Sequence, residues 1–160
     1  MPRSEERFLA AARELGLEPE VRRFPEGTRT AEDAARAIGC DVAQIVKSLV
    51  FVAEDGPFLA LTSGANRADP ARLGVELGAN GVRRATADEV REATGYAIGG
   101  TPPFGHARPL RVLVDRDLMV HEELWAAAGR PDTVFPIRAE ALVEASRGRV
   151  ADFRASPGSA

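Results

Sequence analysis

Lysine is almost absent from this chain of 160 residues: Lys47 is the only one, although the sequence carries 21 basic side chains. Arginine serves wherever a generic positive charge suffices, so a single lysine indicates a task for a compact ammonium on a flexible stem. The alternation of residues 45–52 predicts a buried strand with Ile45, Lys47, Leu49 and Phe51 on one face. A charge there needs a partner or a ligand-binding cavity. The alternative is a lysine at a strand end that extends its ammonium to water.

Cysteine and histidine are also scarce. Cys40 is the only cysteine, which excludes a disulfide framework and a thiolate metal cage. The two histidines, His106 and His121, are far apart and have no Cys or His partner nearby, which disfavours a zinc site. No Ser/His/Asp or Cys/His set stands out as a nucleophile with its base. We therefore expect no metal and no cofactor, and a metal hydrolase is disfavoured by the count of ligands.

Long apolar runs are missing as well. No stretch approaches membrane-spanning length and the first residues are polar, so we expect a cytoplasmic protein with no membrane partner. A net charge of −3 argues against non-specific coating of nucleic acid but leaves room for a basic patch that meets one end of it. The length and the 44% hydrophobic fraction fit one globular domain. We place that domain at residues 1–153, followed by a flexible tail at 154–160.

Helices and strands are interspersed without a regular strand–helix–strand repeat, which predicts a mixed α+β fold. Capping signals mark two helices: Thr30 with Asp33 three residues later, and Asp69 followed by Pro70. Helices are expected near residues 4–15, 30–38, 69–77, 88–93, 122–128 and 139–146. Strands are expected near residues 20–24, 45–52, 58–62, 82–85, 110–115 and 133–137.

Residues 95–106 are rich in glycine and proline, which predicts a loop whose backbone can bind a ligand. Gly99 and Gly100 let the backbone approach a ligand and turn N–H groups inward, and Pro102-Pro103 braces that geometry. Successive inward N–H groups are what an ester carbonyl needs as it becomes an oxyanion. A tight structural turn is the alternative. The spacing matches neither the Walker phosphate loop nor the dinucleotide fingerprint, which excludes those two classes.

The sequence leaves alternatives open for each of two further polar residues, His106 and Asp115. His106 either donates a hydrogen bond from the rim of the glycine loop or is a solvated loop residue. Asp115, at the end of an apolar strand, pairs with Lys47 or with a nearby arginine, or caps the next helix.

Three segments together resemble the YbaK/EbsC family of aminoacyl-tRNA editing domains, which are related to the insertion domain of bacterial prolyl-tRNA synthetase. The resemblance extends over residues 19–153 and implies a mixed, partly rolled β-sheet with helices packed around it and a pocket beside the lysine. The segments that carry it are Thr30-Ala-Glu-Asp-Ala-Ala-Arg-Ala-Ile-Gly39, Ile45-Val-Lys-Ser-Leu-Val-Phe51 and Gly95-Tyr-Ala-Ile-Gly-Gly-Thr-Pro-Pro-Phe-Gly105.

The resemblance implies a trans-editing hydrolase that cleaves the ester between a wrong amino acid and tRNA, commonly tRNA-Pro carrying Cys, Ala or Ser. By position, Lys47 orients the 3′-terminal adenosine, the amides of Gly99 and Gly100 stabilise the carbonyl oxygen, and a ribose hydroxyl helps to activate water. The implied partners are the 3′ acceptor end of aminoacyl-tRNA and a prolyl-tRNA synthetase or an elongation factor. The expected substrate-binding residues are Thr30, Thr62, Ser63, Thr101, Pro103 and His106.

A different class of function remains open from the sequence. The same pocket would serve a non-catalytic module that binds tRNA or a nucleotide. In either case a few arginines would contact phosphates, with solvated surface arginines as the alternative. The candidates are Arg22, Arg23, Arg83, Arg84, Arg108 and Arg111.

Overall fold

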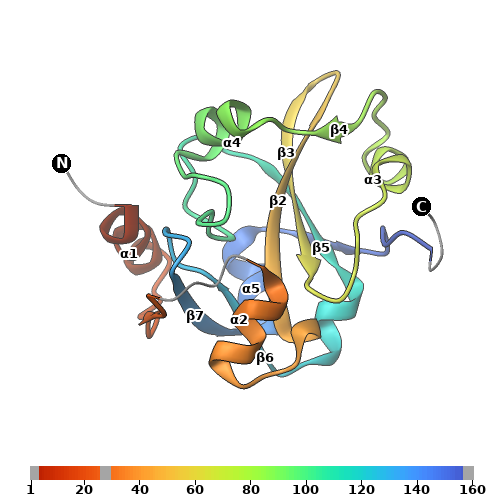
Figure 1. The fold of residues 1–160 in the computed structure, drawn as a ribbon. Helices are drawn as coiled ribbons and strands as arrows, with labels where there is room; N and C mark the ends of the chain where they lie inside the picture. The colour runs from red at the N-terminus through yellow and green to blue at the C-terminus, as the bar shows by residue number, and fades with distance from the viewer. Residues whose placement is uncertain (1–3, 26–29, 157–160) are drawn as a thin grey trace.

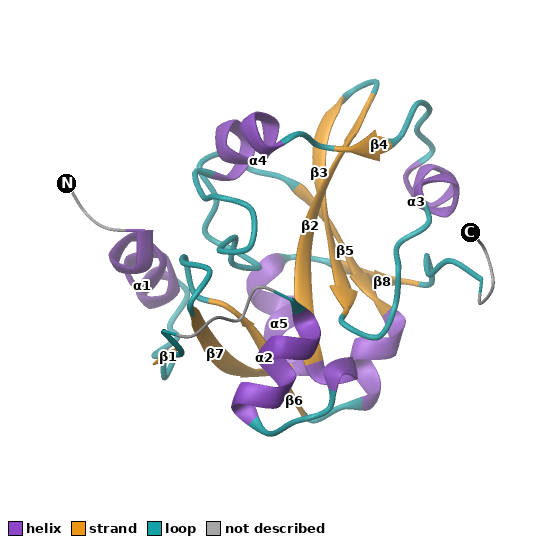
Figure 2. Cartoon of the chain, viewed as in Figure 1, coloured by secondary structure: helices purple, strands orange, loops and turns teal. Residues whose placement is uncertain are grey.

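A mixed β-sheet organises the molecule in the computed structural model, which describes residues 4–25 and 30–156 (Figures 1 and 2). Within these residues the sheet has eight strands, and its main path runs β1-β7-β6-β2-β3-β5-β8, with β4 paired to β2. This confirms the expected α+β class. The strands are β1 (Arg22–Arg23), β2 (Ile45–Ala53), β3 (Gly56–Ser63), β4 (Arg83–Arg84), β5 (Arg111–Asp115), β6 (Glu123–Ala127), β7 (Thr133–Arg138) and β8 (Arg149–Ala151).

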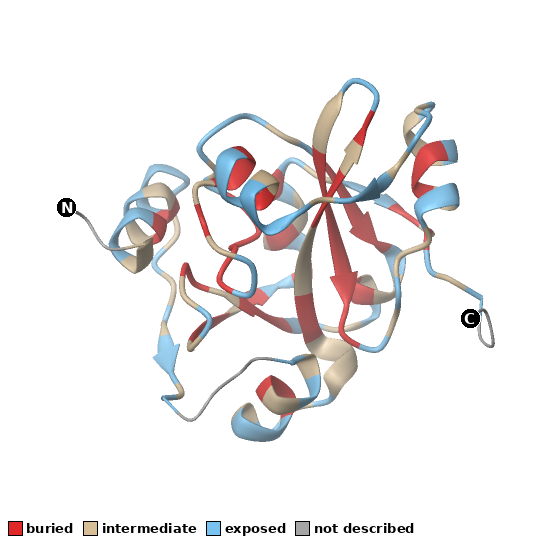
Figure 3. Ribbon diagram, turned by 45° about the horizontal axis from the view of Figure 1, so that its top comes forward, coloured by how far each residue is buried: buried red, intermediate tan, exposed pale blue. Residues whose placement is uncertain are grey.

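Helices cover the sheet on its two faces and at its ends, and Figure 3 shows that their outward surfaces are exposed. Of the two central strands, β3 is mostly buried, whereas part of β2 is only half-buried. The α-helices are α1 (Ser4–Glu14), α2 (Ala31–Ile38), α3 (Pro70–Leu77), α4 (Ala87–Thr94) and α5 (Ala139–Ser146), and two short 3-10 helices are η1 (Val42–Gln44) and η2 (Arg116–Val120). No helix in the described ranges is both long and apolar enough to traverse a bilayer.

The expected caps of two helices are confirmed. The Thr30 side chain accepts a hydrogen bond from the Asp33 backbone N–H and begins α2. Asp69 caps α3 in the same way, and Pro70 occupies its first turn. Gly78 ends α3 in a left-handed conformation, which glycine adopts without steric cost. Local sequence alone therefore fixes where these two helices begin and where α3 ends.

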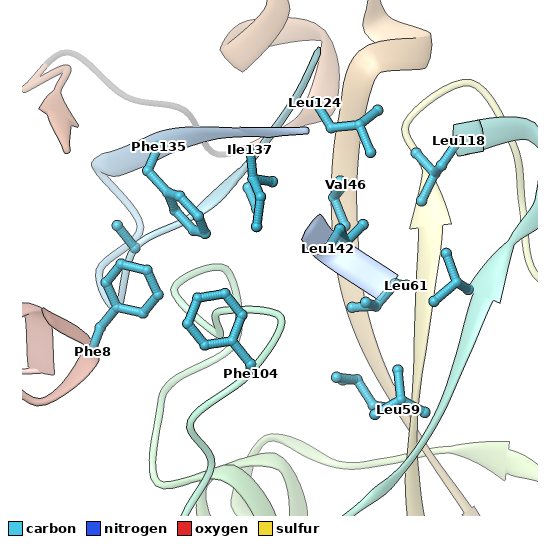
Figure 4. Close-up of a cluster of buried hydrophobic side chains, with 14 of the residues drawn as sticks. Phe8, Val46, Leu59, Leu61, Phe104, Leu118, Leu124, Phe135, Ile137 and Leu142 are labelled. Carbon is cyan, nitrogen blue, oxygen red and sulfur yellow. The ribbon is translucent and has the colours of Figure 1, made fainter. Parts of the chain in front are cut away.

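Two apolar clusters occupy the two faces of the β2–β3 hairpin. The larger one gathers Phe8, Phe104 and Phe135, whose ring centroids lie 4.7–5.9 Å apart (Figure 4). Phe51 and Phe58 belong to the second cluster, on the opposite face. Because Phe104 is 2% exposed and lies among rings from α1 and β7, it anchors the glycine-rich loop to the core.

One edge of β2 is only partly covered. Along its other edge β2 pairs with β3 from Val46 to Ala53. On the partly covered edge, β6 pairs with residues 45–46 and β4 pairs with residues 51–52. The stretch of β2 between these two partners, which contains Lys47 and Ser48, therefore faces a gap in the sheet.

The prediction of a helix at residues 122–128 is wrong. Residues 123–127 form β6, which pairs in parallel with β2 and antiparallel with β7. The alanines favour a helix locally, but Leu124, Trp125 and Ala126 are all buried in the sheet. Tertiary pairing thus overrides helix propensity here.

Smaller differences concern the ends of the chain. The first predicted strand shortens to β1, and β8 was not predicted. The predicted tail begins at Arg154, yet Arg154 bridges to Ala68 and the Ala155 backbone N–H donates to the Arg67 carbonyl. Residues 157–160 lie outside the described ranges.

Candidate functional site

A cavity of about 380 Å³ lies at the open stretch of β2. Its walls come from α2, from β2 itself, from the glycine-rich loop and from the β6–β7 region. It therefore joins the three segments that carry the family resemblance. The lining residues are Thr30, Ala31, Glu32, Ala34, Ile45, Val46, Lys47, Ser48, Leu49, Val50, Gly64, Arg84, Val90, Ile98, Gly99, Thr101, Trp125, Ala126, Ala127, Pro131, Thr133 and Val134.

Lys47 is a half-buried member of this cavity, and its Nζ donates a hydrogen bond to the backbone oxygen of Asn66 over 2.6 Å. Strand register places it opposite Thr62 on β3, on the face that Leu49 and Phe51 also share. The predicted alternation is thus confirmed. The ammonium is not simply extended to water, because a protein carbonyl holds it beside the cavity.

Burial lowers the pKa of Lys47 below its ordinary value of 10.5, because the charged form loses hydration. Glu32 and, to a smaller degree, Asp115 oppose this effect, since nearby carboxylates favour the ammonium. Arg84 and Arg67 add to it. The cavity wall is thus a place where the positive charge of Lys47 is only partly compensated by protein groups. A ligand with oxygen acceptors would complete that compensation.

The two loop glycines have different roles. Gly99 lines the cavity and has a φ of +88°, which favours glycine. Gly100 is buried and outside the lining, and its N–H donates to the Ala97 carbonyl over 3.0 Å. The expectation that both amides face a ligand is therefore not met at Gly100, whose N–H closes a turn. The loop presents Gly99 to the cavity and uses Gly100 to pack against Arg130.

Two of the expected substrate-binding threonines do line the cavity. Thr30 lies at the start of α2, and its hydroxyl is engaged as the helix cap. Thr101 follows the glycine pair, and its hydroxyl donates to the Ala97 carbonyl over 3.1 Å. Both hydroxyls therefore shape the wall through intramolecular hydrogen bonds.

Four other expected residues are not among the lining residues. Thr62 is paired with Lys47 across the β2–β3 hairpin and is 0% exposed, and its hydroxyl donates to the Ala60 carbonyl. The Ser63 hydroxyl donates to the Ala43 carbonyl. Pro103 is buried in the loop.

His106 is the fourth of these residues, and it braces the loop. Its Nε2 lies 2.7 Å from the Pro102 carbonyl oxygen. Burial lowers the pKa of the ring, because the imidazolium would lose hydration. The geometry gives His106 a structural contact within the loop, and the cavity receives no histidine.

Sequence reasoning missed the wall residue Glu32, and it named Arg84 only as one of six candidate phosphate contacts, not as part of the cavity wall. Glu32 belongs to the family-like segment that begins at Thr30, so its place in the first turn of α2 was a usable signal. Arg84 is brought to the wall because β4 pairs with β2 at Phe51, where its guanidinium lies 5.4 Å from the ring centroid. That contact depends on a distant pairing that no local pattern marks.

No group of three or more His, Cys, Asp or Glu side chains gathers to suit a metal ion within the part of the chain that the structure describes. Glu32 is the one carboxylate in the described lining. The described wall offers the Lys47 ammonium, the Arg84 guanidinium, the Glu32 carboxylate, the Gly99 backbone and several small apolar side chains. Such a site suits the binding and orientation of a polar ligand.

Comparison with known proteins defines the class. The family model of the aminoacyl-tRNA editing domain matches residues 25–145. The match contains every residue that lines the cavity. The chain belongs to the aminoacyl-tRNA editing domain family.

Among curated relatives, the uncharacterized protein YwhH of Bacillus subtilis is 31% identical over 134 residues, covering 83% of this chain and 85% of YwhH. A proline--tRNA ligase of Xanthomonas oryzae pv. oryzae is 36% identical over 90 residues, or 56% of this chain but 16% of the ligase. The ligase of Maridesulfovibrio salexigens is 28% identical over 107 residues, or 67% of this chain and 18% of the ligase. The chain thus corresponds to less than a fifth of these ligases.

Solved structures agree with this assignment. A candidate trans-editing enzyme for prolyl tRNA synthetase superposes with a TM-score of 0.91 at 44% identity, covering 96% of this chain and 98% of that one. The hypothetical protein APE2540 gives a TM-score of 0.86 at 29% identity, covering 94% of this chain and 100% of that one. The relationship to editing proteins therefore extends over the whole fold.

Proposed function

We propose that this protein is a trans-editing hydrolase that removes a wrong amino acid from tRNA, with tRNA-Pro carrying Ala, Cys or Ser as the first substrates to test. The observation that carries the proposal is the cavity in which the ammonium of the only lysine and the Gly99 wall meet. The relatives named above support a link to proline-specific tRNA. For the same reason a prolyl-tRNA ligase, rather than an elongation factor, is the protein partner to test first.

The reaction assigned to the cavity is hydrolysis of an ester. Water adds to the carbonyl carbon, the ribose oxygen of the terminal adenosine leaves with a proton, and the products are a free amino acid and uncharged tRNA. Lys47 orients the terminal adenosine through the acceptors of its ribose or phosphate. To Gly99, which lines the cavity, we assign the backbone donor that stabilises the carbonyl oxygen as it gains negative charge.

Activation of water is assigned to the substrate itself. The described cavity wall holds no histidine or cysteine, and the Thr30 hydroxyl is engaged as a helix cap. A ribose hydroxyl of the tRNA, placed next to the ester, is the base that the family resemblance implies. In this assignment the protein contributes positioning and electrostatic stabilisation.

The apolar part of the wall favours a small amino-acid side chain. Val46, Ala126, Ala127 and Pro131 are small or compact groups on the wall, and Trp125 closes it near β6. A cavity of about 380 Å³ that also receives part of an adenosine leaves little room for a large side chain. Discrimination between side chains that differ by one methylene amounts to only about 1–3 kcal/mol.

One observation favours a second function, a binding module without chemistry. The Gly100 N–H donates to the Ala97 carbonyl, so the loop offers fewer free donors to an oxyanion than the glycine pair suggests. Such a module would bind the acceptor end of tRNA or an adenosine nucleotide through the same Lys47 wall.

A deacylation assay separates the two functions. Purified protein is mixed with Ala-, Cys- and Ser-tRNA-Pro and, as the matched control, with correctly charged Pro-tRNA-Pro. Release of the mismatched amino acids well above the spontaneous rate, with Pro-tRNA-Pro spared, supports the hydrolase. Tight binding of tRNA or of an adenosine nucleotide without release of any amino acid supports the module and rejects the hydrolase.

A further inference from the structure

Asp115 is a buried carboxylate that the proposed hydrolysis leaves without a task. It is 1% exposed and ends β5, next to the end of β3. Its Oδ2 accepts hydrogen bonds from the Ser63 backbone N–H over 3.0 Å and from Asn66 Nδ2 over 2.9 Å. Its Oδ1 accepts from the Asp117 backbone N–H over 2.9 Å. The carboxylate is thus fully engaged, and it does not contact Lys47 directly.

Asn66 connects this buried carboxylate to the cavity. Its backbone oxygen is the acceptor of the Lys47 ammonium, at 2.6 Å. Its side-chain amide donates to Asp115 Oδ2 and, over 2.8 Å, to Asp117 Oδ2. The loop that carries the acceptor of Lys47 is therefore tied to two carboxylates by the side chain of the same residue.

A second tie reaches the same point from the C-terminal segment. Arg154 Nη1 donates to Asp117 Oδ2 over 3.0 Å, and the Ala155 backbone N–H donates to the Arg67 carbonyl over 2.7 Å. These contacts hold the residue that follows Asn66 and the carboxylate that faces it. Residues 154 and 155, which were predicted to belong to a tail, thus help to hold the loop that carries the acceptor of Lys47.

Capping of η2 explains only part of this arrangement. The cap uses Asp115 Oδ1, which accepts from Asp117. The other oxygen serves the end of β3 and the Asn66 amide, which the cap does not require. A carboxylate that served only as a cap would not need the Ser63 N–H and the Asn66 amide as donors to Oδ2.

We propose that Asp115 and Asn66 are positioning residues that hold the carbonyl acceptor of Lys47 and so fix its ammonium at the cavity. Lysine has a long stem with several rotatable bonds, so without a fixed acceptor its ammonium would sample many positions. Misplacement of about 1 Å can cost on the order of a hundredfold in rate. The catalytic consequence rests on the proposed function, whereas the fixing of Lys47 does not.

The decisive variant is Asn66→Ala. Every residue at position 66 keeps the backbone carbonyl that Lys47 uses, so an effect on Lys47 must act through the position of the loop. The matched control is Asp69→Ala, which removes a side-chain hydrogen bond to the Ala71 backbone N–H in the same connection and has no bond to Lys47.

Because Lys47 is the only lysine, protein labelled with ¹³C-lysine gives one set of side-chain NMR signals. We expect two distinct Hε resonances in the wild type and in Asp69→Ala, as a fixed ammonium requires. In Asn66→Ala they should merge into one averaged signal, and deacylation should fall about tenfold or more. Distinct Hε resonances in Asn66→Ala, like those of the wild type, would overturn the proposal.

Two further measurements keep the test decisive. If Asn66→Ala does not fold, Asp117→Ala, which removes one of the two carboxylate acceptors of the Asn66 amide from a partly exposed site, replaces it and should show the same averaging to a smaller degree. If the wild type hydrolyses no aminoacyl-tRNA, the proposed function fails while the NMR comparison still decides whether Asn66 fixes Lys47.

Discussion

Gly100 lies directly against the backbone of Arg130: a Cβ at position 100 would come within 2.9 Å of the Arg130 Cα. Real Cβ atoms essentially never approach so closely, and a backbone atom cannot rotate away as a flexible side chain can. Arg130 precedes Pro131, which lines the cavity, and Gly100 follows Gly99, which lines it too. The glycine at position 100 therefore sets the separation of two cavity walls.

Gly100→Ala should consequently impair the site more than an ordinary loop substitution. We expect the loop and the segment at residue 130 to move apart, with a loss of about 1–3 kcal/mol in the free energy of unfolding from overpacking. Deacylation should fall about tenfold or more, since the Gly99 wall shifts. Chemical denaturation and a deacylation assay measure the two effects.

Gly78→Ala is the control for this prediction. Gly78 ends α3 with a φ of +63°, and a Cβ there would meet nothing within 4 Å. The substitution should cost stability through backbone strain of about 1–2 kcal/mol and leave deacylation unchanged. Equal losses of activity in the two variants would show that the rate follows general stability, not the position of the loop.

Lys47→Arg tests whether charge alone suffices at the cavity. The ammonium lies 2.6 Å from the Asn66 carbonyl oxygen, and the wider planar guanidinium cannot keep that contact in the same space. Deacylation should fall on the order of a hundredfold while the thermal midpoint changes little. Lys47→Ala should also lose activity and remain folded. Near-wild-type turnover by Lys47→Arg would show that the site needs only a positive charge and that the single lysine has no special role.

Local signals in the sequence predicted the capped helices and the central hairpin. Thr30, Asp69 and Pro70 act through neighbours a few residues away, so their effect is readable from the chain alone. The strand at residues 123–127 could not be read in this way, because its alanines favour a helix and only pairing with β2 and β7 makes it a strand.

The candidate site shows the same division. Lys47 and Gly99 could be predicted because one is a unique residue in an apolar strand and the other belongs to a rare glycine cluster. Arg84 was named only as one of six candidate phosphate contacts, because its place on the cavity wall depends on the pairing of β4 with β2. His106 was expected near the substrate, but its bond to the Pro102 carbonyl depends on how the loop folds back on itself.

The arginines divide into two groups that bear on tRNA binding. Arg23, Arg83 and Arg111 form ion pairs with Glu5, Glu89 and Asp55 respectively. The other three candidates have no ion pair among the described residues: Arg22 and Arg84 lie over the rings of Trp125 and Phe51, and Arg108 is exposed. About three of these six candidates are thus available for phosphates.

We therefore expect the logarithm of the tRNA association constant to fall with the logarithm of salt concentration at a slope of about −2 to −3. Arg84→Ala should weaken binding and reduce the slope by about 0.7–0.9, because one phosphate contact is lost. Arg111→Ala, whose guanidinium pairs with Asp55, should change neither. Filter binding over a salt series measures both, and a wild-type slope much steeper than −3 would contradict so small a contact set.

The lowered pKa of Lys47 predicts opposite effects of alkaline pH on activity and on stability. Burial makes the folded protein release this proton below 10.5, the ordinary value that the unfolded chain retains. Between the two pKa values the unfolded state binds more protons than the folded state, so the contribution of Lys47 to stability rises with pH. In the proposed function deacylation needs the ammonium, so we expect its rate above spontaneous hydrolysis to fall over the same window. Lys47→Met, which has no titrating group there, should lack this rise when unfolding free energies are compared with those of the wild type. A wild-type rate that holds constant while the NMR signal of the single lysine titrates would show that the charge of Lys47 has no part in the reaction.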